Sequence, residues 1–345
     1  MKLQDFDFDL PLELIAQQPA HERDHSNLLI SQNDDCKIIK FYSLLDYLRP
    51  GDLLVFNNSR VINAKLLLEK NNNKPINLNL NKPLKGNIWL GFVRPAKKIS
   101  EGDIFNFNEH KILIRKKLEF GEVEIEFILD NISVFDFLDQ YGMVPLPQYI
   151  KRESKLSEDD LRYQNIYSKP LGSVANATAG LHFTKKLMEE MQAMKIDTAF
   201  VTLHVGAGTF LPVKTENIQE HKMHSEWCEV SEMTADKINL AKSQNRRVIV
   251  IGTTSMRTIE SCSENGVVIP QSKETNIFIN PGYQFQIADL MLTNFHLPKS
   301  TLFMLVCAFA GMDRMKGLYK YAIENKMRFF SYGDAMLIER SKNFK

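Results

Sequence analysis

The period at which apolar residues recur changes at about residue 65 and again at about residue 142, and this change restricts the folds open to the chain. From 65 to about 129, short runs alternate apolar and polar residues between Gly and Pro, as in a small all-β unit. After 142, short apolar strands alternate with segments of helical period, which is typical of a sheet covered by helices. We therefore predict a discontinuous α/β body, residues 1–64 plus 143–345, with a smaller all-β domain of residues 65–142 inserted into it.

The same periods predict the individual elements. In the body, the expected helices span residues 11–16, 158–167, 184–194, 234–244 and 300–310. The expected strands of the body span residues 53–56, 198–203, 247–251, 276–279 and 290–295. The expected strands of the insert span residues 87–93, 104–107, 111–117 and 122–128. The last two form a hairpin, and its acids are expected to face its cations across the strands; these residues are Glu122, Glu124 and Glu126 opposite Lys111, Arg115 and Lys117.

The overall charge does not point to a partner, because 43 Lys and Arg nearly balance 42 Asp and Glu, for a net charge of +1. The charge is unevenly distributed, however. Between residues 65 and 98, eight basic residues accompany a single acid, Glu69. This stretch suits a surface that neutralises phosphates, and it equally suits a solvated face rich in Lys and Asn, so both interpretations stay open.

Two further features bear on location and on metal chemistry. No run of apolar residues approaches 18, and the first residues are acidic and lack an apolar signal segment, so we expect no membrane span and a cytoplasmic protein. The four cysteines are far apart and form no CxxC pair, which favours reduced, mostly buried thiols over a zinc site.

Gly206 and Gly208 follow the strand expected at 198–203. A dinucleotide fingerprint needs a third glycine and a helix directly afterwards, and Pro212 follows instead. The two glycines are therefore expected to allow a ligand to approach the backbone closely, or to form a tight turn.

The strand expected at 247–251 leads into a turn rich in hydroxyls, with Thr253, Thr254, Ser255 and, one turn later, Arg257. Free backbone N–H groups, hydroxyls and a cation at the start of a helix favour an anion site. The simpler alternative is that Thr254 or Ser255 only caps the helix; Arg257 favours the anion site.

Several histidines and cations stand in loops or at the ends of expected strands. His182 and His296 do so, and each alone is more often a hydrogen-bonded structural residue than a catalyst. His221 and His224 lie near Glu226 but lack the HExxH spacing of zinc proteases, so hydrogen-bonded or ligand-binding histidines are favoured over a metal site. The cations that follow strands are Arg60, Arg94 and Lys97. These residues indicate an enzyme with a polar site for an anionic ligand.

Longer motifs run through the chain in order, among them NNSRVI at 57–62, RPAK at 94–97, TAGLHF at 178–183, FVTLHVGAGTF at 200–210, GTTS at 252–255, NFHLP at 294–298 and RFFSYGDAM at 328–336. Together they resemble the S-adenosylmethionine:tRNA ribosyltransferase-isomerases of the queuosine pathway. The resemblance extends from Phe6 to Ile338, which is nearly the whole chain.

The resemblance implies a reaction and its partners. The ribosyl group of S-adenosylmethionine moves onto the aminomethyl group of 7-aminomethyl-7-deazaguanine at the wobble position of a tRNA with a G-U-N anticodon, giving epoxyqueuosine-tRNA, adenine and methionine. S-adenosylmethionine is then a consumed co-substrate, with no permanently bound cofactor and no metal. The resemblance also implies an α/β body interrupted by a barrel-like domain; we expect a monomer.

The sequence departs from the usual family pattern at four positions. Asn63 and Lys65 stand where the family usually has Pro and Arg, and Asn176 and Ala177 stand where it has Ala and Pro. Losing a proline loosens the loop that leads to His182, and Lys65 cannot form the bidentate contacts of an arginine. We expect these changes to affect loop rigidity and substrate affinity rather than the type of reaction.

The implied reaction requires a base, because the sulfonium acidifies the C5′ protons of the ribose. Histidine suits that role, and the candidates, which the sequence does not rank, are His182, His204 and His296. Asp334 completes the catalytic candidates, either as a carboxylate base in place of a histidine or as the group that holds an ammonium. The cations are candidates for holding a phosphate or the methionine carboxylate. The full set of substrate-binding candidates is Arg60, Arg94, Lys97, Thr178, Gly206, Gly208, His221, His224, Thr253, Thr254, Ser255, Arg257 and Ser331.

Two other functions stay open. A methyltransferase is disfavoured because its glycine-rich strand–loop–helix is missing from the sequence. A noncatalytic tRNA-binding protein is disfavoured because hydroxyl and histidine motifs are dense in the α/β part rather than replaced by a basic surface.

Overall fold

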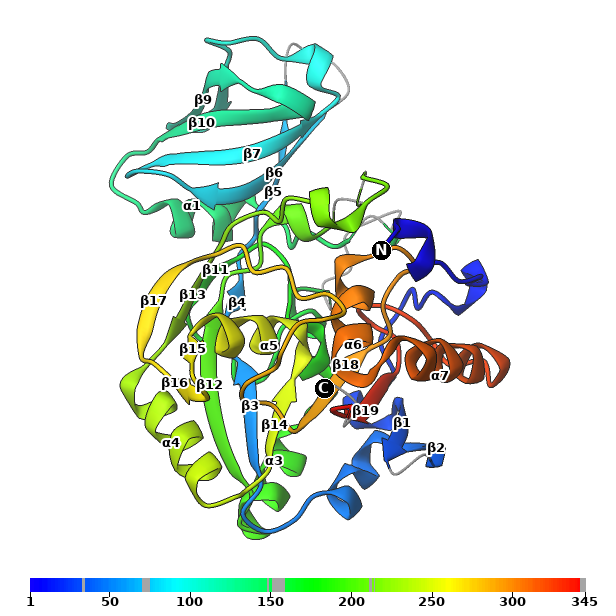
Figure 1. Ribbon diagram of the computed structural model, residues 1–345. Helices are drawn as coiled ribbons and strands as arrows, with labels where there is room; N and C mark the ends of the chain where they lie inside the picture. The colour runs from blue at the N-terminus through cyan, green and yellow to red at the C-terminus, as the bar shows by residue number, and fades with distance from the viewer. Residues whose placement is uncertain are drawn as a thin grey trace.

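The structure, a computed structural model, describes residues 1–32, 35–69, 75–147, 149–150, 159–210, 213 and 215–341 (Figure 1). Two sheets organise these residues, one of nine strands and one of six. The α/β fold class with a smaller barrel-like all-β part is confirmed. No helix in the described ranges is both long and apolar enough to cross a membrane.

The nine-stranded sheet forms the larger part of the molecule. Its strands, in spatial order, are β17 (Gln271–Thr275), β13 (Glu226–Val230), β12 (Asp197–Leu203), β3 (Leu53–Asn57), β14 (Val248–Ile251), β18 (Leu290–Asn294), β19 (Ala335–Glu339), β1 (Asn27–Gln32) and β2 (Asp35–Lys40). The four central strands β12, β3, β14 and β18 are parallel. Antiparallel neighbours flank them, β13 beside β12 and β19 beside β18.

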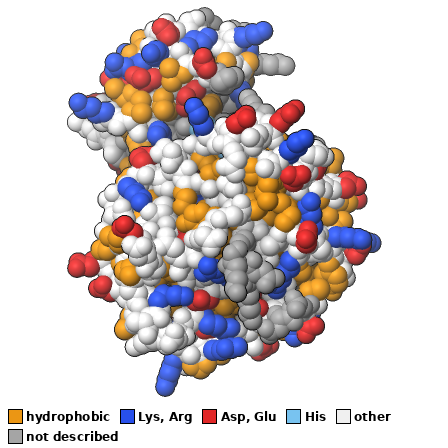
Figure 2. Space-filling model, viewed as in Figure 1, with side chains coloured by type: hydrophobic (Ala, Val, Ile, Leu, Met, Phe, Trp, Pro, Cys, Tyr) orange, Lys and Arg blue, Asp and Glu red, His pale blue; other side chains and the backbone are white. Residues whose placement is uncertain are grey.

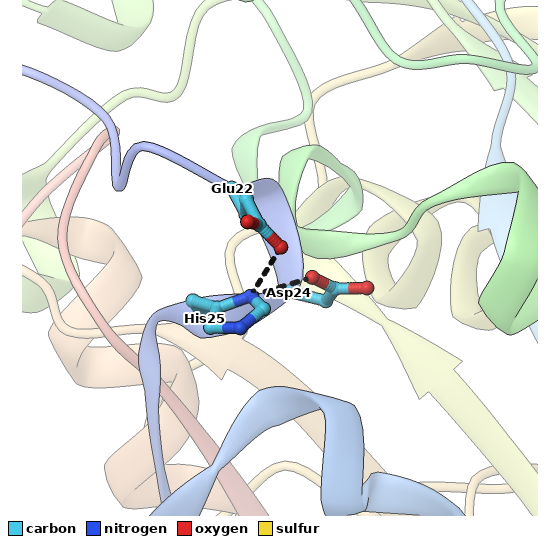
Figure 3. Close-up of side chains that lie close together, drawn as sticks. All are labelled: Glu22, Asp24 and His25. Atoms are coloured by element: carbon cyan, nitrogen blue, oxygen red, sulfur yellow. Dashed lines mark hydrogen bonds and ion pairs between the residues drawn. The ribbon is translucent and has the colours of Figure 1, made fainter.

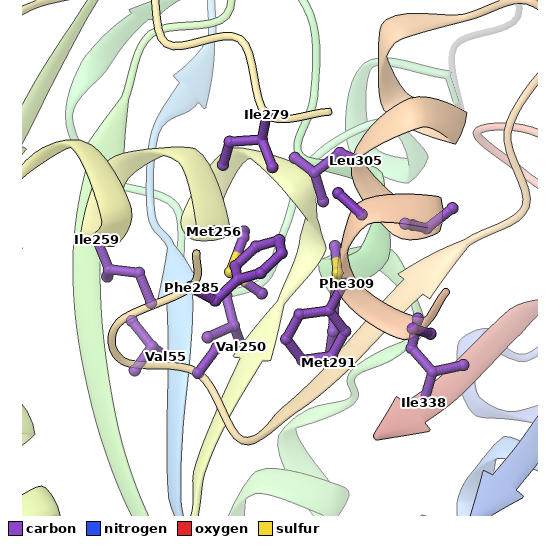
Figure 4. Close-up of a cluster of buried hydrophobic side chains, with 14 of the residues drawn as sticks. Val55, Val250, Met256, Ile259, Ile279, Phe285, Met291, Leu305, Phe309 and Ile338 are labelled. Carbon is purple, nitrogen blue, oxygen red and sulfur yellow. The ribbon is translucent and has the colours of Figure 1, made fainter. Parts of the chain in front are cut away.

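Both faces of this sheet are covered, which is why its central strands are continuously apolar. In β3, Val55 packs in one core while Leu54 and Phe56 pack in another on the opposite face. The elements on the Val55 side are α4 (Glu232–Ser243), α5 (Gly252–Ser261), α6 (Thr301–Ala310) and α7 (Met312–Glu324). The elements on the other side are α3 (Lys185–Ala193) and the 3-10 segments Phe41–Tyr47 and Thr178–His182. Figure 4 shows strand residues such as Val250 and Met291 meeting Met256 of α5 and Phe309 of α6.

The six-stranded sheet is antiparallel throughout and bends into a barrel-like shape (Figure 1). Its strands, in spatial order, are β5 (Lys65–Leu68), β6 (Ile76–Pro83), β7 (Ile88–Arg94), β10 (Glu122–Ile128), β9 (His110–Lys117) and β8 (Ile104–Phe107). Its core includes residues of α1 (Val134–Tyr141). The chain enters and leaves this sheet side by side, because Lys65 and Met143 exchange two backbone hydrogen bonds of 3.0 and 2.8 Å. The division of the chain into domains at residues 65 and 142 stays a prediction.

The predicted hairpin is present, and one of its predicted charge contacts is wrong. Val123, Ile125 and Phe127 of β10 are buried. On the other face, Arg115 pairs with Glu124 and Glu126 as expected. Lys117 instead donates to the carbonyls of Ala96 and Ile99, because its long side chain reaches the neighbouring turn.

Some local predictions are corrected by the structure. The strand expected at 276–279 is absent, and the strand of this region is β17, whose polar residues at the edge of the sheet alternate between exposed and partly or fully buried positions. Ile279 is apolar because it packs into the core. The helix expected at 11–16 is a single 3-10 turn, Leu12–Leu14. The helix expected at 158–167 is α2 (Asp159–Arg162), and residue 158 lies outside the described residues. All four cysteines are free thiols, and three are buried while Cys36 is exposed.

Candidate active site

The carboxyl ends of the four parallel strands meet at one edge of the large sheet, and the sequence motifs meet there with them. Ser59 follows β3, His204 follows β12, Thr253 follows β14 and His296 follows β18. This is the edge at which open α/β sheets usually bind ligands. A cavity of about 430 Å³ lies here. The predicted site residues that line it are Thr178, Thr253, Thr254, Arg257, His296 and Ser331.

One wall of the cavity is the start of α5. Gly252 has a φ of +84°, which lets the chain turn directly from β14 into the helix. No side chain of the described residues caps this helix, so the capping alternative for Thr254 and Ser255 is wrong. Ser255 donates instead to the carbonyl of Ile251 at 2.7 Å, and the hydroxyl of Thr254 has no hydrogen-bond partner among the described residues. The first backbone N–H groups of α5 are therefore available to an anion.

Arg257 forms a buried ion pair that the motifs did not indicate. Its Nη1 donates to Oε2 of Glu226, and each side chain is 4 % exposed. Oε1 of Glu226 accepts from the backbone N–H of Gly206 at 2.9 Å. The next N–H, of Ala207, donates to Oδ1 of Asn81 on β6 at 3.0 Å, so the turn that carries the two glycines contacts both sheets.

Two asparagines place amide oxygens at the cavity wall. Nδ2 of Asn176 donates to the carbonyl of Tyr163 at 2.7 Å, and Nδ2 of Asn294 donates to that of Phe330 at 2.9 Å. These bonds fix the two amides with their oxygens free, since neither Oδ1 has a hydrogen-bond partner among the residues described. Both residues line the cavity, so the cavity offers acceptors as well as donors. Asn176 is one of the positions that depart from the family pattern.

His296 is the one predicted catalytic histidine that lines the large cavity. Its Nε2 lies 3.2 Å from Oγ1 of Thr293, and its backbone N–H donates to the hydroxyl of Tyr319 at 2.9 Å. Burial lowers the pKa of His296 to about 3, so the imidazole is neutral at pH 7. A neutral imidazole is the form that can accept a proton.

His182 lies behind this cavity, beside a smaller one of about 20 Å³ that shares Ser331 with it. Its Nδ1 is 2.7 Å from the hydroxyl of Ser26, and its ring stacks on Phe41 with centroids 4.8 Å apart. Burial lowers the pKa of His182 to about 4, although the charge of Asp334 opposes that shift. Its Nε2 is buried without a hydrogen-bond partner among the described residues, and the ring lies near the side chain of Asn294 in the cavity wall.

His204 occupies a third environment, in which its Nδ1 is 2.7 Å from the hydroxyl of Ser59. That hydroxyl also bonds Ser173, at 2.6 Å. The His204 ring stacks on Trp227 with centroids 5.0 Å apart, and burial lowers its pKa to about 4. His204 is not part of the lining of the large cavity.

These three histidines should make the protein acid-sensitive. Their pKa values in the folded state lie below the ordinary 6.5, so the unfolded chain binds more protons as the pH falls from about 6.5 to about 4. We expect the contribution of these histidines to the free energy of unfolding to be fully present above pH 6.5 and to fall below it, by about 1.4 kcal/mol per pH unit for each fully buried histidine. Urea unfolding at several pH values checks this, and His296→Asn should flatten the slope. An unchanged slope in that variant would contradict the assignment.

Asp334 has no open side toward the large cavity. It is fully buried, and it accepts hydrogen bonds from the backbone N–H groups of Asn27 and Arg328 at 2.9 and 2.8 Å. The side chains of the same two residues each donate to it at 3.2 Å. This carboxylate joins the starts of β1 and β19, and its proposed contact with an ammonium stays a prediction.

The remaining candidates lie away from the cavity. His224 is exposed and covers Gly208, while His221 packs against Phe278. The three candidate cations are all exposed; they are Arg60, Arg94 and Lys97. Within the described ranges, Glu22, Asp24 and His25 are the one group spaced like metal ligands, and Figure 3 shows His25 between the two carboxylates. Its Nδ1 is 3.1 Å from each, so these side chains, of which Asp24 is partly buried, already pair with one another.

Comparisons with known proteins show the family. The sequence model of a protein family described as queuosine biosynthesis protein matches residues 3–338 of this chain. S-adenosylmethionine:tRNA ribosyltransferase-isomerase of Rickettsia bellii strain RML369-C is 58% identical over 355 residues, covering 99% of both chains. The enzyme of the same name from Rickettsia prowazekii is 52% identical, covering 99% of this chain and all of its own. This chain belongs to the queuosine biosynthesis family.

A solved structure agrees with this family membership. The crystal structure of S-adenosylmethionine tRNA ribosyltransferase from Thermotoga maritima is 32% identical, with a TM-score of 0.54, and the match covers 97% of this chain and 99% of that one. The resemblance drawn from the motifs is confirmed, and so is the class of enzyme, a transferase of queuosine biosynthesis. The roles of individual residues stay predictions.

The sequence patterns of this family member do not identify three residues of the site, which are Glu226, Asn294 and Asn176. Glu226 was considered only as part of a metal motif, although its carboxylate is directed at Arg257. Asn294 belongs to the NFHLP motif, which assigns no role to this residue. Asn176 differs from the family pattern, which predicts no contact for it. A polar residue at the end of an apolar strand is the available signal for Asn294. Neither spacing nor periodicity could pair Glu226 with Arg257.

Proposed function

We propose that this chain transfers and isomerises the ribosyl group of S-adenosylmethionine onto 7-aminomethyl-7-deazaguanine at the wobble position of tRNA, releasing adenine and methionine. One observation supports locating this reaction in the large cavity. The cavity at the carboxyl edge of the large sheet is lined by buried polar atoms without partners among the described residues, on Arg257, Thr254, Asn176 and Asn294. Buried polar atoms are normally satisfied, so a cavity with several free ones is built for a polar ligand.

The cavity suits S-adenosylmethionine in size and in chemistry. Its volume of about 430 Å³ lies in the range of small-molecule sites. Arg257 and the start of α5 supply donors for a carboxylate, and the amide oxygens of Asn176 and Asn294 supply acceptors for an amine. Apolar residues such as Phe295 and Leu302 line the rest and suit an adenine ring. The compound is a consumed co-substrate, and the proposal includes no permanently bound cofactor.

His296 is the proposed base. It lines the cavity, and the sulfonium of a bound co-substrate makes the C5′ protons of the ribose acidic. Removal of one such proton gives an ylide at C5′. Adenine then leaves and takes up the proton held by His296, the aminomethyl nitrogen attacks and loses a proton, and methionine leaves with the electron pair of the C5′–S bond as the epoxide closes.

The tRNA is proposed to contact the small sheet through Arg94 and Lys97. Arg94 ends β7 and Lys97 lies in the 3-10 turn Ala96–Lys98, and both side chains are exposed. Lys117 holds this turn in place through the carbonyls of Ala96 and Ile99. Figure 2 shows Lys and Arg side chains among Asp and Glu on the visible face of the part that contains the small sheet. The binding of tRNA is therefore proposed to depend on particular cations rather than on a uniform basic surface.

Removing either cation should weaken tRNA binding whatever the tRNA sequence. Arg94→Ala and Lys97→Ala are expected to reduce the slope of log affinity against log salt by about 1 each, because each phosphate contact releases counterions. Arg115→Ala is the matched control, since Glu124 and Glu126 already neutralise this arginine. Binding titrations at several salt concentrations measure the slopes. Unchanged slopes in both test variants would favour the solvated-face interpretation.

Product analysis tests the proposed function directly. The purified chain is incubated with S-adenosylmethionine and a tRNA that carries the aminomethyl base in a G-U-N anticodon. Release of adenine and methionine with ribosyl transfer supports the proposal. S-adenosylhomocysteine would indicate a methyltransferase, and an unconsumed co-substrate would indicate binding alone.

Two finer statements belong to the same proposal. We infer that the enzyme acts as a monomer, and that it acts in the cytoplasm, where its tRNA substrate is found. Sedimentation of the enzyme with and without tRNA checks the monomer. A dimer at working concentrations would contradict it.

A further inference from the structure

We propose that Arg257 is the carboxylate receptor of the large cavity, binding the methionine carboxylate of S-adenosylmethionine through Nε and Nη2, and that Glu226 is the positioning residue that holds the guanidinium for this contact. The proposal deepens the proposed function and rests on it. Of the two residues, Arg257 alone is expected to touch the ligand.

The first support is the way in which Arg257 is held. Glu226 occupies Nη1, while Nε and Nη2 are buried without a hydrogen-bond partner among the residues described. Arg257 is 3 % exposed and lines the cavity. Nε and Nη2 form the side of a guanidinium on which two parallel N–H bonds meet one carboxylate. A buried cation with that side unused is costly unless a ligand completes it.

The second support is another arginine of the same chain. Arg247, at the opposite end of β14, donates from Nε to Oδ1 of Asp52 at 2.8 Å and from Nη2 to Oδ2 at 2.5 Å. The protein thus shows the arrangement in which this side of a guanidinium holds a carboxylate. Arg257 presents the same two nitrogens, and no carboxylate of the described residues occupies them.

The surroundings favour a small carboxylate over a phosphate of tRNA. Thr254 lies one turn before Arg257 on α5, and its hydroxyl and the uncapped first N–H groups of the helix add donors beside the guanidinium. These donors offset the negative charge of Glu226. A phosphate on the surface of a folded tRNA is bulky and solvated, whereas Arg257 is almost completely buried. The carboxylate of a bound small molecule can reach it.

Glu226 acts through Arg257 and through the turn that follows β12. One carboxylate oxygen holds the guanidinium, and the other accepts from the N–H of Gly206 at 2.9 Å. Together these contacts limit rotation of the arginine side chain before the ligand arrives. Such preorganisation lowers the entropy lost on binding.

The decisive test compares two co-substrates in matched variants. S-adenosylmethionine and its decarboxylated analogue differ by the carboxylate alone. The wild-type enzyme should favour S-adenosylmethionine by about 100-fold in kcat/KM, or in affinity where the analogue is only an inhibitor, because two charge-assisted hydrogen bonds are lost. In Arg257→Met the preference should fall to near unity, mainly through weaker use of S-adenosylmethionine. Arg257→Lys should be intermediate, because an ammonium cannot form the bidentate contact.

Glu226 is tested by the same ratio. Glu226→Ala should lower the preference toward that of Arg257→Met, although residue 226 does not touch the ligand, while Glu226→Gln should retain part of it. Loss of structure alone would lower the use of both co-substrates equally and leave the ratio unchanged. Arg247→Met is the matched control: it removes a similar ion pair with Asp52 and should reduce stability without altering the ratio.

The outcomes separate this inference from the proposed function. Adenine release by the wild type together with an unchanged ratio in Arg257→Met would overturn the carboxylate receptor and leave the function intact. An unchanged ratio with a reduced salt slope for tRNA would make Arg257 a phosphate ligand instead. If the wild type released no adenine, the proposed function would fail, and calorimetric binding of the two compounds would still test the receptor. Where Arg257→Met does not fold, Arg257→Lys supplies the comparison.

Discussion

His296→Asn is expected to lower the turnover number by about 10²–10⁴-fold, the usual contribution of general acid–base catalysis. Affinity for S-adenosylmethionine should change far less, because proton transfer belongs to the transition state. The reason is positional: among the three candidate histidines, His296 alone lines the large cavity. His182→Asn and His204→Asn serve as controls and should affect turnover less.

Isotope exchange provides an independent reading of the same prediction. Deuterium at C5′ of S-adenosylmethionine should wash out into solvent in the wild type, if deprotonation is reversible without tRNA, and should be retained in His296→Asn. A histidine that only orients the ligand would show its loss in affinity instead. If all three variants kept near-normal turnover, the histidine hypothesis would be wrong, and an amine of the acceptor base would become the better candidate.

Asp334→Ala should lower the free energy of unfolding by about 3 kcal/mol, which is the largest stability effect we expect from a single polar residue here. The carboxylate is fully buried and accepts four hydrogen bonds, two of them from backbone N–H groups that would lose their partners. Arg328 contributes less, because its side chain is one-third exposed and can be solvated by water.

Urea unfolding measures this effect, with turnover as the second reading. Asp334→Asn keeps the shape and part of the acceptor capacity, so it should recover part of the lost stability. If Asp334 instead held the ammonium of a substrate, Asp334→Asn would raise KM and leave the unfolding midpoint unchanged. That result would return Asp334 to the set of substrate-binding residues.

The structure also explains why some sequence predictions succeeded. The helix expected at 184–194 forms as α3, and the hydroxyl of Thr184 caps it by accepting from the N–H of Leu187. The strands at 53–56 and 247–251 were found because both faces of the sheet are covered, which makes the runs continuously apolar. The strand at 276–279 failed because an apolar run packed against the core does not need to be a strand.

By itself, the sequence determined the class of fold, the positions of most central strands, the family and the motifs that would meet at the edge of the sheet. Each depends on residues that are close in the chain, where period, capping and spacing act directly. The tertiary structure alone decided that Arg257 is paired with Glu226, 31 residues away, that Asp334 joins two strands, and that His296 rather than His182 lines the cavity. These depend on contacts between distant segments, because the direction of a side chain and its share of burial are set only when the layers pack together.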